Sequence, residues 1–67
     1  MTNTIELDVA IRRAGLTKRA VAARLGITET SLYQKINNRT EFKASEVALL
    51  RDLLKIDNVD DIFFAKM

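Results

Sequence analysis

The sequence predicts an all-α fold, a compact bundle of five short helices that forms a single domain over residues 1–67. Apolar residues recur every three or four positions, which is the spacing of an amphipathic helix, and no segment alternates strictly as a strand does. Residues that cap helix starts precede these stretches, and both glycines fall between them. A chain of 67 residues encloses only a small core, so association of two copies would add to its stability.

The first helix is expected to begin after Asn3. Asn3 and Glu6 have the spacing of a capping box, in which each side chain accepts a hydrogen bond from the backbone of the other residue. Ile5, Val9 and Ile11 then supply an apolar stripe. Gly15 is expected to end this helix.

Residues 16–36 predict two helices that meet at Gly26 and Ile27. Thr17 and Thr28 can each accept a hydrogen bond from the first turn that follows, so the helices are expected over about 18–25 and 29–36. Gly26 tolerates the positive φ of a tight turn between helices, and the pattern is that of a helix-turn-helix. The apolar positions of this unit are Val21, Ala22, Leu25, Ile27, Leu32 and Ile36.

The remaining elements follow a polar segment at residues 37–40. Phe42 is the only large apolar residue between Ile36 and Val47, and we expect it to anchor this segment to the core. Ser45 is the expected cap of a central fourth helix, and Asn58 that of a short fifth helix. The fourth helix carries Val47, Leu49, Leu50, Leu53, Leu54 and Ile56, and the fifth carries Asp60 and Asp61 in its first turn with Val59, Ile62, Phe63 and Phe64.

Charge is distributed unevenly along the chain. Between Arg12 and Arg39, seven basic residues stand against one acidic residue, Glu29, whereas from residue 44 onward five acidic residues outnumber three basic ones. The basic stretch suits a polyanion, because neutralising phosphates releases counterions. The alternative is that these charges only keep a small domain in solution.

Residues 16–42 resemble the DNA-binding domain of phage lambda-type repressors and Cro proteins, and the five expected helices extend the likeness over nearly the whole chain. The resemblance rests on Thr17, Ala22, Gly26, Ile27, Leu32 and Asn37. The segment 59–64 also resembles the endings of small repressor-like proteins from phages and prophages. The chain departs from the family pattern at Lys18, where glutamine is frequent, at Lys35, which is often apolar, and at Asn38, which replaces a common glycine.

The resemblance implies sequence-specific binding of double-stranded DNA by a transcriptional regulator. Glu29, Thr30 and Gln34 would face the major groove as base-reading residues, with Tyr33 beside them. Gln34 can pair with adenine through two hydrogen bonds, and Thr30 can contact a thymine methyl. Glu29 has three alternatives: it accepts from cytosine, it orients Lys18 or another basic neighbour, or it complements the helix dipole. Tyr33 either stacks on the DNA or covers its own helix.

Phosphate contacts are expected around the same helix. The resemblance implies them for Lys18 and Asn37, and Ser31 flanks the reading residues. Lys35, Arg39 and Lys43 lie in or just past this helix, so phosphate contact is favoured over base reading, with simple solvation as the alternative.

A single reading helix covers few base pairs, so a symmetric homodimer is expected on a pseudo-palindromic operator. Adjacent helix positions point about 100° apart, and Phe63 and Phe64 therefore do not both fit easily into one small core. The expected dimer interface is Ile62, Phe63, Phe64 and Met67.

Other functions have weaker support in the sequence. The chain has no histidine, no cysteine and no glycine-rich phosphate loop, so no enzyme activity, cofactor or metal site is expected. The N-terminal residues do not form a signal peptide, and no apolar run approaches a membrane span, which favours a cytoplasmic protein. The alternative function is a protein-binding module on the same scaffold, an antirepressor or antitoxin that seizes a partner protein.

Overall fold

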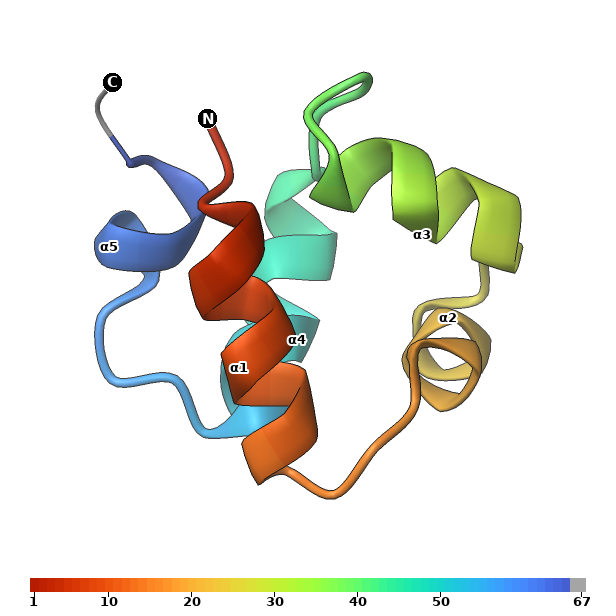
Figure 1. Cartoon of the computed structure of the whole chain (residues 1–67), viewed down its shortest axis with the longest axis horizontal. Coiled ribbons are helices and arrows are strands. Elements are labelled where there is room, and N and C mark those ends of the chain that lie inside the picture. Colours follow the sequence, from red (N-terminus) through yellow and green to blue (C-terminus); the bar gives the residue numbers. More distant parts are fainter. Residues whose placement is uncertain (66–67) are drawn as a thin grey trace.

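The computed structural model describes residues 1–65, and over these residues the chain is all-α, as predicted (Figure 1). The helices surround one core, and the molecule measures 28 × 23 × 20 Å along its principal axes. α4 packs against both α1 and α5, while α2 contacts α3. The five helices are α1 (Thr4–Arg13), α2 (Lys18–Leu25), α3 (Glu29–Ile36), α4 (Ala44–Leu54) and α5 (Val59–Phe63).

The start of α1 is capped by Asn3, whose side chain accepts the Glu6 N–H at 3.1 Å. The reciprocal bond of the predicted capping box is replaced, because the Asn3 N–H donates instead to the carbonyl of Ile62 at 2.6 Å. Leu7 and Ile11 form the buried face of α1. The prediction for Ile5 is wrong: two helical steps separate it from Leu7, about 200° around the axis, and it is 74% exposed.

The bounds predicted for the second and third helices are confirmed. The hydroxyls of Thr17 and Thr28 each accept an N–H from the following turn, at 3.1 Å. Gly26 ends α2 at φ +71°, in the left-handed region, and nothing crowds the position that a Cβ would occupy. The backbone conformation, and not a lack of space, therefore favours glycine at this turn.

α4 begins earlier than the sequence predicted. Lys43 is the residue before its first turn, and Ser45, the expected cap, lies inside the helix. The start is fixed by Glu46, whose carboxylate accepts the Lys43 N–H at 2.8 Å. α4 also buries a narrower stripe than expected, since Leu49 is 50% exposed.

α5 closes the core. Asn58 caps it as predicted and accepts the Asp60 N–H at 3.0 Å. Phe42 anchors the segment between α3 and α4, since its ring lies edge-on to that of Phe63 with centroids 5.3 Å apart. The buried core residues are Leu7, Ile11, Val21, Ala22, Leu32, Ile36, Val47, Leu50, Leu54, Ile62 and Phe63.

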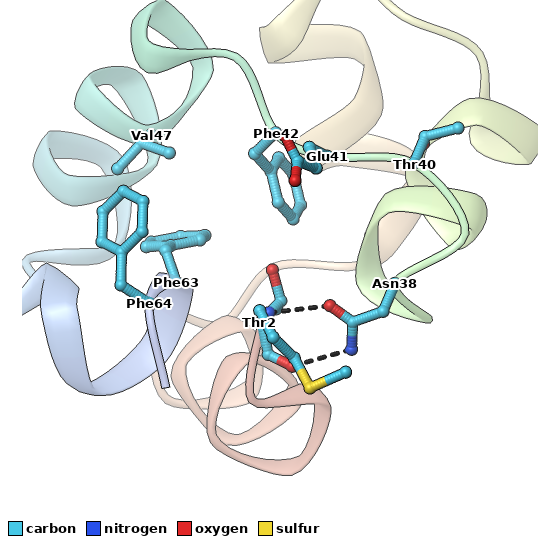
Figure 2. A pocket seen from close by; sticks show the side chains of 9 residues that line it. Thr2, Asn38, Thr40, Glu41, Phe42, Val47, Phe63 and Phe64 are labelled. Atoms are coloured by element: carbon cyan, nitrogen blue, oxygen red, sulfur yellow. Dashed lines mark hydrogen bonds between the residues drawn. The ribbon is translucent and has the colours of Figure 1, made fainter. Parts of the chain in front are cut away.

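The N-terminal residues connect the end of α3 to the end of α5. Asn38 forms two hydrogen bonds with the backbone of Thr2: Oδ1 accepts the Thr2 N–H at 2.7 Å, and Nδ2 donates to the Thr2 carbonyl at 2.9 Å (Figure 2). The Thr4 hydroxyl donates to the carbonyl of Ile36 at 2.7 Å. On the other side, the Ala65 N–H donates to the carbonyl of Met1 at 2.9 Å.

Candidate nucleic-acid interface

α3 has one buried face and one open face. Leu32 and Ile36 are buried in the core, whereas Thr30 and Gln34, one turn apart, are exposed. Glu29 and Tyr33 are exposed on the same helix. All four side chains that the sequence predicted as base-reading therefore reach solvent.

Ser31 lies at the margin of the open face. It is half-buried, and its N–H donates to the capping hydroxyl of Thr28 at 3.1 Å. Its backbone N–H thus forms part of the cap at the start of α3.

Lys18 is the first residue of α2, and its side chain lies close to residues of α1 and α3. Its ammonium lies 3.2 Å from Oδ1 of Asp8 on α1 and 5.3 Å from the centre of the Tyr33 ring on α3. A cation over an aromatic face at this distance is attracted by the ring quadrupole. The Lys18 charge therefore lies beside the open face of α3 and already has an acidic partner.

Glu29 has a basic neighbour of its own. Its Oε1 lies 3.9 Å from Nε of Arg19, the second residue of α2. Both side chains are largely exposed, so water screens the pair and it adds little stability. If Glu29 orients a basic neighbour, that neighbour is Arg19, because Lys18 pairs with Asp8. Glu29 also lies in the first turn of α3, where an acid complements the helix dipole.

Lys35 differs from the sequence prediction. Its side chain is only 11% exposed, and its ammonium lies 3.0 Å from Oε1 of Glu46 and donates to the carbonyl of Glu41 at 3.1 Å. The ring centre of Phe42 is 5.9 Å away. Because the ammonium is turned inward, Lys35 joins α3 to the start of α4 and does not present its charge to a phosphate.

The segment after α3 leaves its polar side chains open to solvent. Asn37, Arg39 and Lys43 are all exposed, as a phosphate contact would require. The Arg39 N–H donates to the carbonyl of Gln34 at 2.8 Å, which fixes the turn against the end of α3. Asn38 within this turn has φ +64°, a left-handed conformation that asparagine tolerates better than most residues.

The sequence showed no sign of a role for Asp8 or Glu46, and it indicated Arg19 only as one member of the basic stretch. Asp8 and Glu46 each pair with a lysine ten or more positions away, and no local pattern marks such a partner. Glu46 stands three residues after Lys43, at the acidic position of a capping box, but lysine is not one of the residues that mark the first position of such a box.

The predicted interface at the C-terminal end is corrected in part. Ile62 and Phe63 are buried in the core and are not free to meet a second copy. Phe64 is 59% exposed, and Met67 lies outside the described residues. Phe64 borders a hollow of about 290 Å³ between α4, α5 and the segment after α3, where Phe42 and Val47 also point inward (Figure 2).

Residues 1–65 contain no cluster of three or more acidic, cysteine or histidine side chains that could hold a metal ion. In the same part of the chain, every helix is too short or too polar to cross a membrane.

Comparison of the sequence with protein-family models and with curated proteins, and of the chain with solved structures, finds no match.

Proposed function

We propose that this protein binds double-stranded DNA sequence-specifically, as a phage-type transcriptional regulator of the lambda repressor and Cro kind, with α3 in the major groove. The observation that carries the proposal is the open face of α3, on which Thr30 and Gln34 are exposed one turn apart. α2 and α3 form the helix-turn-helix of this proposal, and capped starts with a left-handed Gly26 support it.

The exposed side chains suit the chemistry of base edges. The Gln34 amide offers one donor and one acceptor, the pair that adenine complements in the major groove. The Thr30 hydroxyl can donate or accept, and its methyl can contact that of thymine. Glu29 can accept from the amino group of cytosine while Arg19 balances its charge against the phosphates.

Affinity would come from the basic residues around α3. Arg39 and Lys43 are exposed just beyond its C-terminal end, Arg19 lies beside Glu29 at its start, and Lys18 lies over the ring of Tyr33 in its second turn. Ser31 in the first turn of α3 and Asn37 at its C-terminal end add polar groups. Phosphate contacts of this kind position a protein on the duplex without reading the sequence.

We also propose that the protein acts as a homodimer. Successive major grooves on one face of DNA lie about 34 Å apart. The longest dimension of one copy is 28 Å, so a single copy does not reach both grooves. Phe64 and its neighbouring hollow offer an apolar surface for the second copy. A dimer bound to a pseudo-palindromic operator would repress transcription by blocking polymerase.

Selection of bound duplexes from a random pool tests the proposal. We expect one enriched, pseudo-palindromic sequence whose affinity falls steeply with added salt and survives excess random competitor. A protein that enriches no sequence and shifts no duplex at low salt would contradict the proposal. That outcome would favour the alternative, a module that binds a partner protein.

A further inference from the structure

Three basic residues of α2 and α3 form ion pairs with acidic residues of the same chain. Within residues 1–65, three ion pairs connect residues distant in the sequence, and each one engages a basic side chain of these two helices. The pairs are Lys18 with Asp8, Arg19 with Glu29, and Lys35 with Glu46. The proposed DNA-binding region thus carries its own acidic partners for its cations.

The pair between Asp8 and Lys18 is placed where a phosphate would compete for it. Both side chains are about one-third exposed, and the Lys18 ammonium lies over the ring of Tyr33, next to the open face of α3. Oδ1 of Asp8 is buried and accepts no hydrogen bond of good geometry from the described residues, so the ammonium at 3.2 Å is its polar partner. The carboxylate is therefore directed at the cation and at no competing donor.

We infer that Asp8 is a specificity-determining residue, an intramolecular competitor that holds the Lys18 ammonium away from DNA phosphates. The inference rests on the proposed function. A duplex held by the base contacts of α3 presents a phosphate at a fixed place beside Lys18 and displaces the carboxylate. A random duplex lacks those contacts, and the pair with Asp8 persists.

The consequence is a lower affinity for random DNA. Non-specific binding depends almost entirely on phosphate contacts, so each cation withheld weakens it directly. Specific binding keeps its base contacts, and it regains the contact between Lys18 and a phosphate once α3 lies in the major groove. Asp8 thereby widens the difference between the two affinities.

The substitution Asp8→Asn tests the inference, with Asp52→Asn as its matched control. Both changes remove one negative charge, but among residues 1–65 Asp52 pairs with its neighbour Arg51 on α4 and with no basic residue of α2 or α3. Fluorescence anisotropy would follow binding of a random duplex and of the selected duplex across a salt series. We expect Asp8→Asn to bind random DNA roughly three- to tenfold more tightly than Asp52→Asn, with a salt slope steeper by roughly 0.9. The gain on the selected duplex should be smaller.

A double-mutant cycle shows whether Asp8 acts through Lys18. In a Lys18→Ala background, we expect Asp8→Asn to change binding no more than Asp52→Asn does. An effect of Asp8→Asn that persists in this background would overturn the inference, as would equal effects of the two substitutions in the wild-type background.

A measurement on the wild-type protein covers the case in which Asp8→Asn fails to fold. The carbon NMR shift of the Asp8 carboxylate should change when the selected duplex is added and stay constant with the random duplex. A change in this NMR shift with both duplexes would overturn the inference, and so would the absence of a change with either duplex. A wild-type protein that binds no duplex would instead refute the proposed function itself, whereas selective binding with no Asp8 effect refutes only the inference.

Discussion

The carboxylate of Glu46 lies 3.0 Å from the ammonium of Lys35, and this pair ties the end of α3 to the start of α4. The same carboxylate accepts the Lys43 N–H at 2.8 Å, and the same ammonium donates to the carbonyl of Glu41 at 3.1 Å. Both side chains are almost fully buried. The segment that carries Arg39 is therefore held at its C-terminal end by one buried ion pair.

The stability of the protein should depend on the charge of Glu46. Burial alone would raise the pKa of Glu46, but the hydrogen bond from Lys43 and the ammonium of Lys35 outweigh it and hold the pKa below its ordinary value of 4.5. A lowered pKa in the folded state means that the carboxylate stabilises the fold fully above pH 4.5, and that this contribution is lost as the pH falls through the folded-state pKa.

Glu46→Gln tests this dependence. We expect the substitution to lower the free energy of unfolding at pH 7 by about 1–3 kcal/mol, because a charge-assisted hydrogen bond is lost and the Lys35 charge stays buried. Urea unfolding from pH 7 to pH 3 should show a smaller loss of stability in the variant than in the wild type. Parallel pH profiles for the two proteins would contradict the role of Glu46.

Asn38 should stabilise the fold through two separable effects. Its amide makes both hydrogen bonds to the Thr2 backbone, and its φ of +64° is strained for most side chains. Asn38→Gly removes the amide and relaxes the backbone, so we expect a loss of about 1–2 kcal/mol. Asn38→Ala removes the amide and keeps the strain, which should cost about 1 kcal/mol more. Thermal unfolding of both variants measures the two effects, and equal losses would show that backbone strain contributes nothing.

Local signals explain why the sequence predicted α2 and α3 to the residue. Thr17 and Thr28 cap the turns that directly follow them, and Gly26 sets the turn between the helices by its own φ. Each signal acts within about four residues. The bounds of these two helices could therefore be predicted from the sequence alone.

The predictions that were wrong or incomplete have one cause, which is contact between residues distant in the sequence. Ser45 has the right chemistry for a cap, but α4 starts at Ala44 because Glu46 joins Lys43 and Lys35 from within the helix. Lys35 looked like a phosphate ligand until its partner on α4 was known. In the same way, nothing near Lys18 in the sequence indicated Asp8. A fold brings such partners together, and a linear pattern does not reveal them.

Gln34 should control sequence preference more than general affinity. We expect Gln34→Ala to weaken binding to the selected duplex by roughly 1–3 kcal/mol and to relax the preference at one base pair. Arg39→Ala is the matched comparison, since Arg39 is exposed just past α3 and is a proposed phosphate contact. It should weaken binding to all duplexes alike and flatten the salt slope by about one. Competition binding against single-base variants of the duplex measures both effects. If Gln34→Ala loses equal affinity for selected and random DNA, Gln34 does not read a base.

Phe64 should decide whether two copies associate. Three of the exposed large apolar residues, Met1, Ile5 and Phe64, border two hollows that share Thr2 and Asn38 in their walls. The exposed apolar side chains therefore lie around two adjacent hollows, and apolar surface of this kind is what a symmetric contact buries. Phe64→Asp places a charge at its edge and should shift the protein to monomer, because a buried unpaired carboxylate disfavours association.

Leu49→Asp supplies the control for this substitution. Leu49 is 50% exposed on α4 and lines neither hollow, so the same charge there should leave the dimer intact. Sedimentation at micromolar concentration, with and without the selected duplex, measures the mass of each variant. A Phe64→Asp protein that remains as dimeric as the wild type, on DNA and off it, would place the contact between copies elsewhere on the molecule.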